Sequence, residues 1–156
     1  MTSPVRVGVV GFGYWGPNLV RNLDRLADAE LIAACDLCED NLGKLSQLYP
    51  YVETTTDLAT MLSRDDIDAV VVASSAPSHF AIASKVLEAG KHCFVEKPLT
   101  LKSADAETLV RMADDKGVTL MTGHLMVYHS AIDWIRECIA SGELGDEIGR
   151  ASCRER

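Results

Sequence analysis

The 156-residue sequence contains no long hydrophobic run and little positive charge. No apolar stretch approaches the ~20 residues that a membrane-spanning helix needs. Lysine and arginine number 15 against 23 aspartates and glutamates, which gives a net charge of -8. This balance argues against nucleic acid or an anionic membrane as the main partner. It does not exclude an anionic cofactor, because backbone N–H groups can bind one inside an acidic protein.

We also expect no secretion signal and no framework of paired cysteines. Residues 1–4 lead directly into an apolar segment, without a small-residue cleavage site. The five cysteines are an odd number, which favours reduced thiols and a cytoplasmic location. Cys35 and Cys38 have the spacing of half a zinc site or of a redox pair, but no second pair of ligands appears. We therefore predict no metal site.

Strand-like and helix-like segments alternate along the whole chain. Apolar runs typical of buried strands cover 5–10, 31–35, 69–73, 92–95 and 118–121, with a weaker one near 51–52. Helical patterns cover 19–27, 42–48, 57–62, 78–89, 103–116 and 131–140, and four residues of the 103–116 helix, Ala106, Leu109, Val110 and Ala113, are expected to face the core. This alternation predicts an α/β fold, with right-handed βαβ units around a doubly wound parallel sheet.

A glycine-rich motif follows the first predicted strand and precedes a helix, reading Gly11-Phe12-Gly13-Tyr14-Trp15-Gly16. In such a motif Gly11 permits the tight turn, Gly13 lets the backbone approach a pyrophosphate, and Gly16 lets the helix pack against the strand. The N-terminus of the helix then faces the phosphates with free N–H groups. The position of the motif between strand and helix favours dinucleotide binding over an ordinary turn.

Asp36 closes the second predicted strand, 20 residues beyond Gly16. A carboxylate at this point meets the ribose hydroxyls of the adenosine and would repel a 2′-phosphate. The sequence therefore favours NAD over NADP. The alternative for Asp36 is a solvated acid at a strand end.

Glu96-Lys97-Pro98 follows the predicted strand 92–95. The carboxyl ends of strands form the edge at which open α/β sheets bind ligands. A lysine there can hydrogen-bond a substrate hydroxyl, and it can stabilise an alkoxide or relay its proton if burial lowers its pKa. On residue chemistry alone, an ordinary surface lysine is the more common alternative.

These motifs together resemble the Gfo/Idh/MocA family, which includes glucose–fructose oxidoreductase and inositol dehydrogenase. The resemblance covers residues 5–146 and is carried by 7–22, 73–100 and 123–145, with Glu-Lys-Pro as its most specific mark. It implies a Rossmann-type NAD(P)-binding domain over 1–122, with 123–146 beginning a crossover to a second, α/β substrate domain that this chain lacks. It also implies an oxidoreductase that acts on CH–OH groups.

The resemblance assigns Lys97 to the catalytic position and to substrate contact, with Glu96 and Pro98 shaping the nicotinamide pocket. The remaining residues implied to bind cofactor are those of the glycine motif with Asp36, then Ser74, Ser75, Ala76 and His79. For His79 a helix cap is the alternative, and for Trp15 it is simple packing over the loop.

His124 and Tyr128 are implied to contact substrate, and a structural hydrogen-bonding role is the alternative for His124. The segments Gly-Tyr-Trp-Gly-Pro-Asn and 123–131 look most like members that oxidise a UDP-linked amino sugar or its uronate. Two other functions stay open, a non-catalytic nucleotide-binding module and an NADP-dependent reductase of the same family. Family members usually form homo-oligomers through the second domain.

The last ten residues, 147–156, carry three arginines and two glutamates and lack a strand pattern. They resemble the translation of a common sequencing-library adapter, so we expect them to be a non-native tail. A chain without the substrate domain is expected to bind NAD but to show little or no turnover alone.

Overall fold

The computed structural model describes residues 3–143 and residue 145. The chain divides after Gly123 into two compact units, which are described separately. The first unit contains β1 (Val5–Val10), α1 (Gly16–Asp24), β2 (Ala29–Cys35), α2 (Glu39–Leu48), β3 (Glu53–Thr55), α3 (Leu58–Leu62), β4 (Ala69–Val72), the 3₁₀ turn η1 (Ala76–Ser78), α4 (His79–Glu88), β5 (His92–Val95), α5 (Ser103–Lys116) and β6 (Leu120–Thr122).

The six strands form one parallel sheet in the order β3-β2-β1-β4-β5-β6. After β3 the chain crosses back to place β4 beside β1, so the direction of winding reverses between these two strands. The loops that follow β1 and β4 therefore separate at the carboxyl edge of the sheet, which is where ligands bind in such folds. The predicted Rossmann-type doubly wound α/β fold is confirmed.

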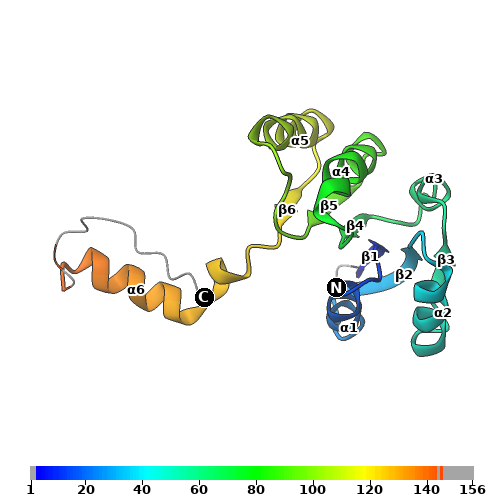
Figure 1. Ribbon diagram of the computed structural model, residues 1–156, viewed down its shortest axis with the longest axis horizontal. Coiled ribbons are helices and arrows are strands. Elements are labelled where there is room, and N and C mark those ends of the chain that lie inside the picture. Colours follow the sequence, from blue (N-terminus) through cyan, green and yellow to red (C-terminus); the bar gives the residue numbers. More distant parts are fainter. Residues whose placement is uncertain (1–2, 144, 146–156) are drawn as a thin grey trace, which may run out of the picture. The chain divides into compact units, whose positions relative to one another are not determined.

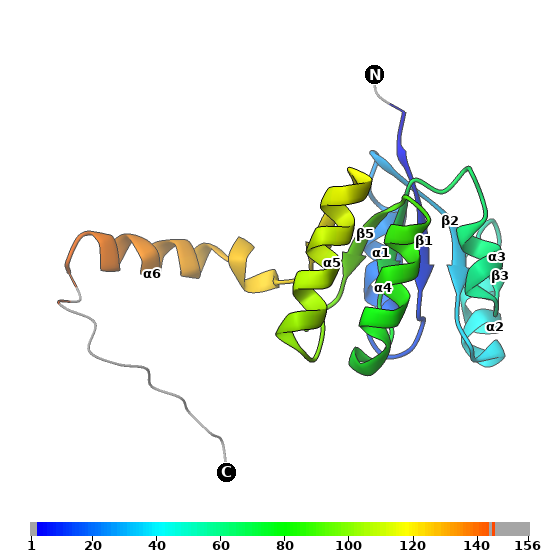
Figure 2. The same cartoon turned by 90° about the horizontal axis from the view of Figure 1, so that it is seen from above.

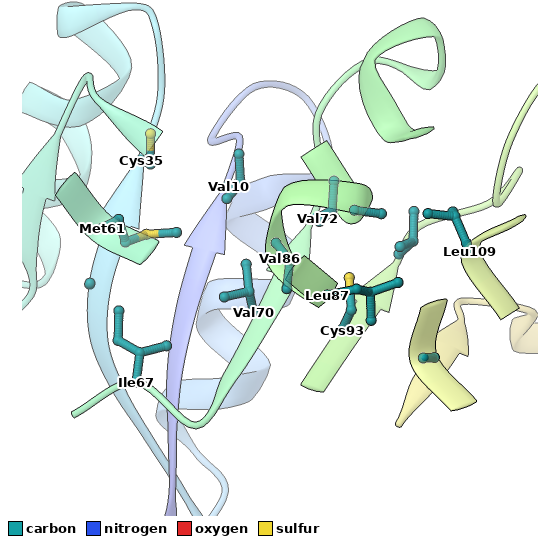
Figure 3. Packing of buried hydrophobic residues seen from close by; sticks show 14 residues of the cluster. Val10, Cys35, Met61, Ile67, Val70, Val72, Val86, Leu87, Cys93 and Leu109 are labelled. Carbon is teal, nitrogen blue, oxygen red and sulfur yellow. The ribbon is translucent and has the colours of Figure 1, made fainter. Parts of the chain in front are cut away.

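Helices cover both faces of the sheet (Figure 1), with α1 and α2 on one face and α3, α4 and α5 on the other. The view at a right angle shows α4 and α5 side by side, in agreement with their contacts (Figure 2). The core on their face includes five fully buried aliphatic side chains, Val70, Val72, Val86, Leu87 and Leu109 (Figure 3). The opposite face has a second cluster around Val9, Val20 and Leu45. Burial of this apolar area on both faces holds the sheet between its helices and fixes its carboxyl edge.

Most elements lie where the sequence patterns place them, but several details differ. The first helix covers Gly16–Asp24 rather than 19–27, and the last strand covers Leu120–Thr122 rather than 118–121. Strand β3 covers Glu53–Thr55 rather than the region near 51–52, because Val52 packs into the cluster with Leu45 before the strand begins. Val110 is 48% exposed, whereas Leu109 is fully buried. The prediction for Val110 was wrong because α5 presents only a narrow stripe to the core, and a neighbouring position is turned by 100° away from it.

The second unit contains the 3₁₀ turn η2 (Leu125–Tyr128) and α6 (Ser130–Ala140). His129 caps α6, since its side chain accepts a hydrogen bond from the backbone N–H of Ala131 at 3.2 Å. None of the helices in residues 3–143 combines the length and the apolar character needed to cross a membrane. The predicted non-native tail, 147–156, lies outside the described residues.

Candidate functional site

The glycine motif forms the tight loop between β1 and α1. Gly11 has a φ of +96°, and a Cβ added to it would lie 2.8 Å from the backbone of Ala73 and Ser74. A Cβ added to Gly16 would overlap the carbonyl oxygen of Gly11. Around Gly13, by contrast, an added Cβ would meet no atom within 4 Å. Gly11 and Gly16 are thus required by the loop's own packing, while Gly13 leaves open space in front of the loop.

Asp36 lies directly beside this loop, after β2. Its Oδ2 accepts hydrogen bonds from the backbone N–H of Phe12 at 2.6 Å and from Nδ2 of Asn41 at 3.2 Å. Its Oδ1 accepts one from the backbone N–H of Cys38 at 2.8 Å. The carboxylate therefore holds the glycine loop and the start of α2 together, which defines its orientation.

A cleft of about 870 Å³ opens over the carboxyl edge of β1, β2 and β4, a size that suits a small-molecule ligand. Seven of the residues that the sequence places at the cofactor line it: Gly11, Gly13, Tyr14, Trp15, Asp36, Ser74 and Ser75. The other seven do not line it: Phe12, Gly16, Ala76, His79, Glu96, Lys97 and Pro98. Phe12 is the plainest case, because its side chain is 5% exposed and packs in the second core cluster.

The rest of the cleft lining includes residues that sequence reasoning missed, among them Thr56, Leu58, Ile82 and Lys85. Asp57 also lines the cleft and caps α3, accepting hydrogen bonds from the backbone N–H groups of Ala59 and Thr60. The Thr60 hydroxyl, the largest influence, lowers the pKa of Asp57. The position of Asp57 at the end of β3 was the available signal, but the cap alone does not say that the residue faces a cleft.

Three serines order the loop between β4 and α4. The hydroxyl of Ser78 donates to the carbonyl oxygen of Ser75 at 2.7 Å. Its oxygen lies 2.8 Å from the hydroxyl of Ser74, so Ser74 acts as the donor to Ser78. Since Ser74, Ser75 and Ser78 all line the cleft, this network orders a part of its wall.

His79 is buried behind this wall, with 1% of its surface exposed. Its Nδ1 pairs with the carbonyl oxygen of Pro98 at 2.8 Å, and its Nε2 pairs with that of Ser74 at 3.0 Å. The side chain therefore connects the loops after β4 and β5. The alternative of a side-chain helix cap was wrong, because no side-chain cap hydrogen bond forms at the start of α4.

Glu96 and Lys97 follow β5 and have opposite environments. Glu96 is 6% exposed, and its Oε1 accepts a hydrogen bond from Nε1 of Trp15 at 2.8 Å. Trp15 thus does more than pack over the loop. Lys97 is exposed, and its ammonium group makes no hydrogen bond or salt bridge with the residues described. The peptide bond between Lys97 and Pro98 is cis.

His124 and Tyr128 belong to the second unit, and both are exposed. Their role at a substrate stays a prediction. In the part of the chain that the structure describes, no three His, Cys, Asp or Glu side chains are grouped to hold a metal ion. Cys35 is buried and Cys38 exposed, both as free thiols, and burial raises the pKa of Cys35.

Comparison with protein families gives one match that covers most of the chain. The model of an oxidoreductase family with an NAD-binding Rossmann fold, GFO_IDH_MocA, matches residues 5–124. A curated relative is dTDP-3,4-didehydro-2,6-dideoxy-alpha-D-glucose 3-reductase of Saccharopolyspora spinosa, 32% identical over 94% of this chain and 44% of its own length. The chain spans about two fifths of the length of the curated relatives it matches.

Solved structures agree with this match and differ in their cofactor. GenD2 from gentamicin A biosynthesis, in complex with NAD, is 32% identical with a TM-score of 0.85, over 92% of this chain and 41% of that one. Biliverdin reductase from Synechocystis, in complex with biliverdin and NADP+, is 29% identical with a TM-score of 0.81, over 88% and 43%. Similarity of fold therefore does not decide whether the cofactor is NAD or NADP.

Proposed function

Because the chain belongs to the Gfo/Idh/MocA oxidoreductase family, we propose that it is the dinucleotide-binding part of an enzyme that uses NAD to oxidise a hydroxyl group of a sugar or nucleotide sugar. The observation that carries the proposal is the Asp36 carboxylate in the wall of the cleft, held 2.6 Å from the backbone N–H of Phe12 in the glycine loop. A carboxylate in this place suits a ribose with free hydroxyls.

The residues present fit a dinucleotide. Gly13 leaves open space beside the N-terminus of α1, where N–H groups and the helix dipole favour a pyrophosphate. When bound, NAD supplies a nicotinamide ring that accepts a hydride from the substrate carbon. The exposed ammonium group of Lys97, at the end of β5, would donate a hydrogen bond to the reacting oxygen and stabilise it as an alkoxide while the hydroxyl proton passes to a base.

NADP is the second candidate cofactor, and two observations favour it. One structural relative is solved with NADP+. Lys85 also places a positive charge in the wall of the cleft, where it would attract a phosphate. The negative charge of Asp36 opposes this, because it would repel a 2′-phosphate in the same cleft.

Calorimetric titration of the 156-residue chain with NAD and with NADP tests the choice. We expect NAD to bind at least about tenfold more tightly, and the ratio to fall in Asp36→Asn, which removes one charge at nearly constant size. Asp40→Asn is the matched control, since Asp40 is exposed in the first turn of α2 and does not line the cleft. Tighter binding of NADP by the unchanged chain would contradict the proposal.

We also propose a substrate, a cellular location and an oligomeric state for the whole enzyme. A UDP-linked amino sugar or its uronate is the proposed substrate, with His124 and Tyr128 among its contacts, in a cytoplasmic homo-oligomer. Because the chain spans about two fifths of its relatives' length, we expect it to bind NAD without turning over such a substrate. Rapid formation of NADH by the 156-residue chain alone would refute that expectation.

In the enzyme with its substrate domain, Lys97→Ala is expected to lower turnover by about 10²-fold or more while NAD affinity changes little. Unchanged turnover would instead favour a module that binds the nucleotide without taking part in chemistry.

A further inference from the structure

Glu96 is a buried carboxylate at the meeting point of three segments. Its Oε1 accepts the hydrogen bond from Nε1 of Trp15, and its Oε2 accepts one from the backbone N–H of Lys97 at 3.2 Å. A Cβ added to Gly123, just after β6, would lie 3.1 Å from the same Oε1. The carboxylate therefore lies between the glycine loop, the end of its own strand and the end of β6.

Within residues 3–143 no lysine or arginine forms a salt bridge with Glu96. Its charge is compensated by N–H donors from Trp15 and Lys97. A carboxylate removed from water depends strongly on such donors. Loss of the Trp15 donor would free the carboxylate to turn, and its bond to Lys97 would change with it.

The backbone around Lys97 is held on both sides. The N–H of Lys97 donates to Glu96, and the carbonyl oxygen of Pro98 pairs with His79. The Lys97 side chain is exposed beyond these contacts. The region that its ammonium group can reach is thus determined by where Glu96 and His79 hold the main chain.

Trp15 belongs to two environments at once. It lines the cleft together with Gly11 and Gly13, and it is partly exposed there. Its indole N–H, the single donor of the side chain, points to Glu96. A ligand in the cleft touches the same ring that holds the buried carboxylate.

We propose that Trp15 is a positioning residue that links occupancy of the cleft to the position of Lys97. The indole ring responds to a ligand at the glycine loop. The indole N–H holds Glu96, and Glu96 in turn holds the main chain of Lys97. This inference rests on the proposed function, because it takes Lys97 as the residue that meets the substrate. A ligand that favours one orientation of the indole therefore changes which positions Lys97 occupies. By the same coupling, a change in the position of Lys97 alters the affinity of the cleft for the ligand.

ADP is the probe that tests this link, because it has the adenosine and pyrophosphate of NAD but no nicotinamide to reach Lys97 directly. Lysines are dimethylated with ¹³C, and the Lys97 signal is assigned by its loss in Lys97→Arg. We expect ADP to shift the Lys97 signal in the unchanged chain, and the shift to fall by about fivefold or more in Trp15→Phe. That variant keeps an aromatic ring at the cleft but has no N–H.

Calorimetry on the methylated proteins gives the ADP affinity of each variant, which we expect to vary by no more than about threefold, since the phosphate-binding backbone is unchanged. Trp134→Phe is the matched control, being the same substitution in α6, and it should leave the ADP-induced shift intact. Glu96→Gln removes the charge at the other end of the same hydrogen bond. It should also reduce the shift, and it decides the question if Trp15→Phe does not fold.

Three results have different meanings. A shift that survives in folded Trp15→Phe, or in Glu96→Gln if Trp15→Phe does not fold, overturns the inference. A wild-type chain that binds ADP without any shift at Lys97 overturns it as well, and in both cases the proposed function stands. A wild-type chain that binds neither ADP nor NAD overturns the proposed function itself.

Discussion

Gly13 and Gly16 have different roles in the glycine loop, and substitution of each residue distinguishes these roles. At Gly16 a methyl group would overlap the carbonyl oxygen of Gly11, so Gly16→Ala is expected to lower the free energy of unfolding by about 2 kcal/mol or more. Gly13→Ala meets no atom and should leave stability within about 0.5 kcal/mol, while filling the space that a pyrophosphate needs. Urea unfolding and NAD titration of both variants measure the two effects. Equal loss of stability in both would show that Gly13 is as closely packed as Gly16.

Asp68 gives a residue-scale prediction for acid. Hydrogen bonds from the side chain and the backbone N–H of Arg6 lower the pKa of Asp68 from 3.8 to about 2. A lowered pKa means that the folded state binds the proton less readily than the unfolded state. The stability from this pair is therefore complete above the unfolded pKa near 4 and is lost as the pH falls towards 2. Both side chains are more than one third exposed, so we expect a small effect.

The measurement is the thermal midpoint of the unchanged chain and of Asp68→Asn between pH 7 and pH 2. Their difference should be constant at neutral pH and should shrink as the pH falls below about 4. A difference that grows towards acid pH would contradict the assigned direction of the pKa shift.

At the scale of elements, helix α5 provides a matched pair of neighbouring residues. Leu109 is fully buried against the core on the face of α4, and Leu109→Ala should cost about 3 kcal/mol of unfolding free energy. Val110 is exposed on the same helix, and Val110→Ala should change it by no more than about 0.5 kcal/mol. Chemical denaturation with both variants distinguishes these values. A large cost at Val110 would mean that this face of α5 is covered.

The sequence predicts elements well where the signal is local. Gly117, with a φ of +64°, ends α5 as its position after Lys116 indicates, and Asp57 caps α3. Val110 shows the limit of such patterns, because apolar character does not state how wide a stripe the sheet covers. Strand β3 shows another, since its three polar residues have no apolar pattern and are recognised as a strand by their pairing with β2.

Contacts across the sheet are beyond any local pattern. Trp15 and Glu96 each belong to a motif that the sequence identifies, yet their hydrogen bond spans 81 residues. Lys85 gives no sign of its place in the cleft, because only the crossover from β3 to β4 brings α4 beside the loops after β1 and β2. The motifs could thus be identified from the sequence, whereas the contacts between them required the fold.

For the whole molecule, the division after Gly123 predicts that the first unit folds without the second. Both hydrophobic clusters consist of residues between Val7 and Leu120. A chain of residues 1–123 should therefore keep its unfolding free energy within about 1 kcal/mol. It should also bind NAD with the affinity of the 156-residue chain. Urea unfolding and calorimetry test this, and a truncated chain that does not fold would show that the core extends beyond Gly123.

The place of Trp15 in the cleft wall has an optical consequence. Tryptophan emits light at wavelengths that a reduced nicotinamide absorbs and an oxidised one does not. With Trp134 replaced by phenylalanine, Trp15 is the remaining indole of the chain, and it lines the cleft in which we propose that the dinucleotide binds. Excitation energy would then pass from Trp15 to NADH but not to NAD, which would make the domain a small ratiometric indicator of the redox state of its own cofactor.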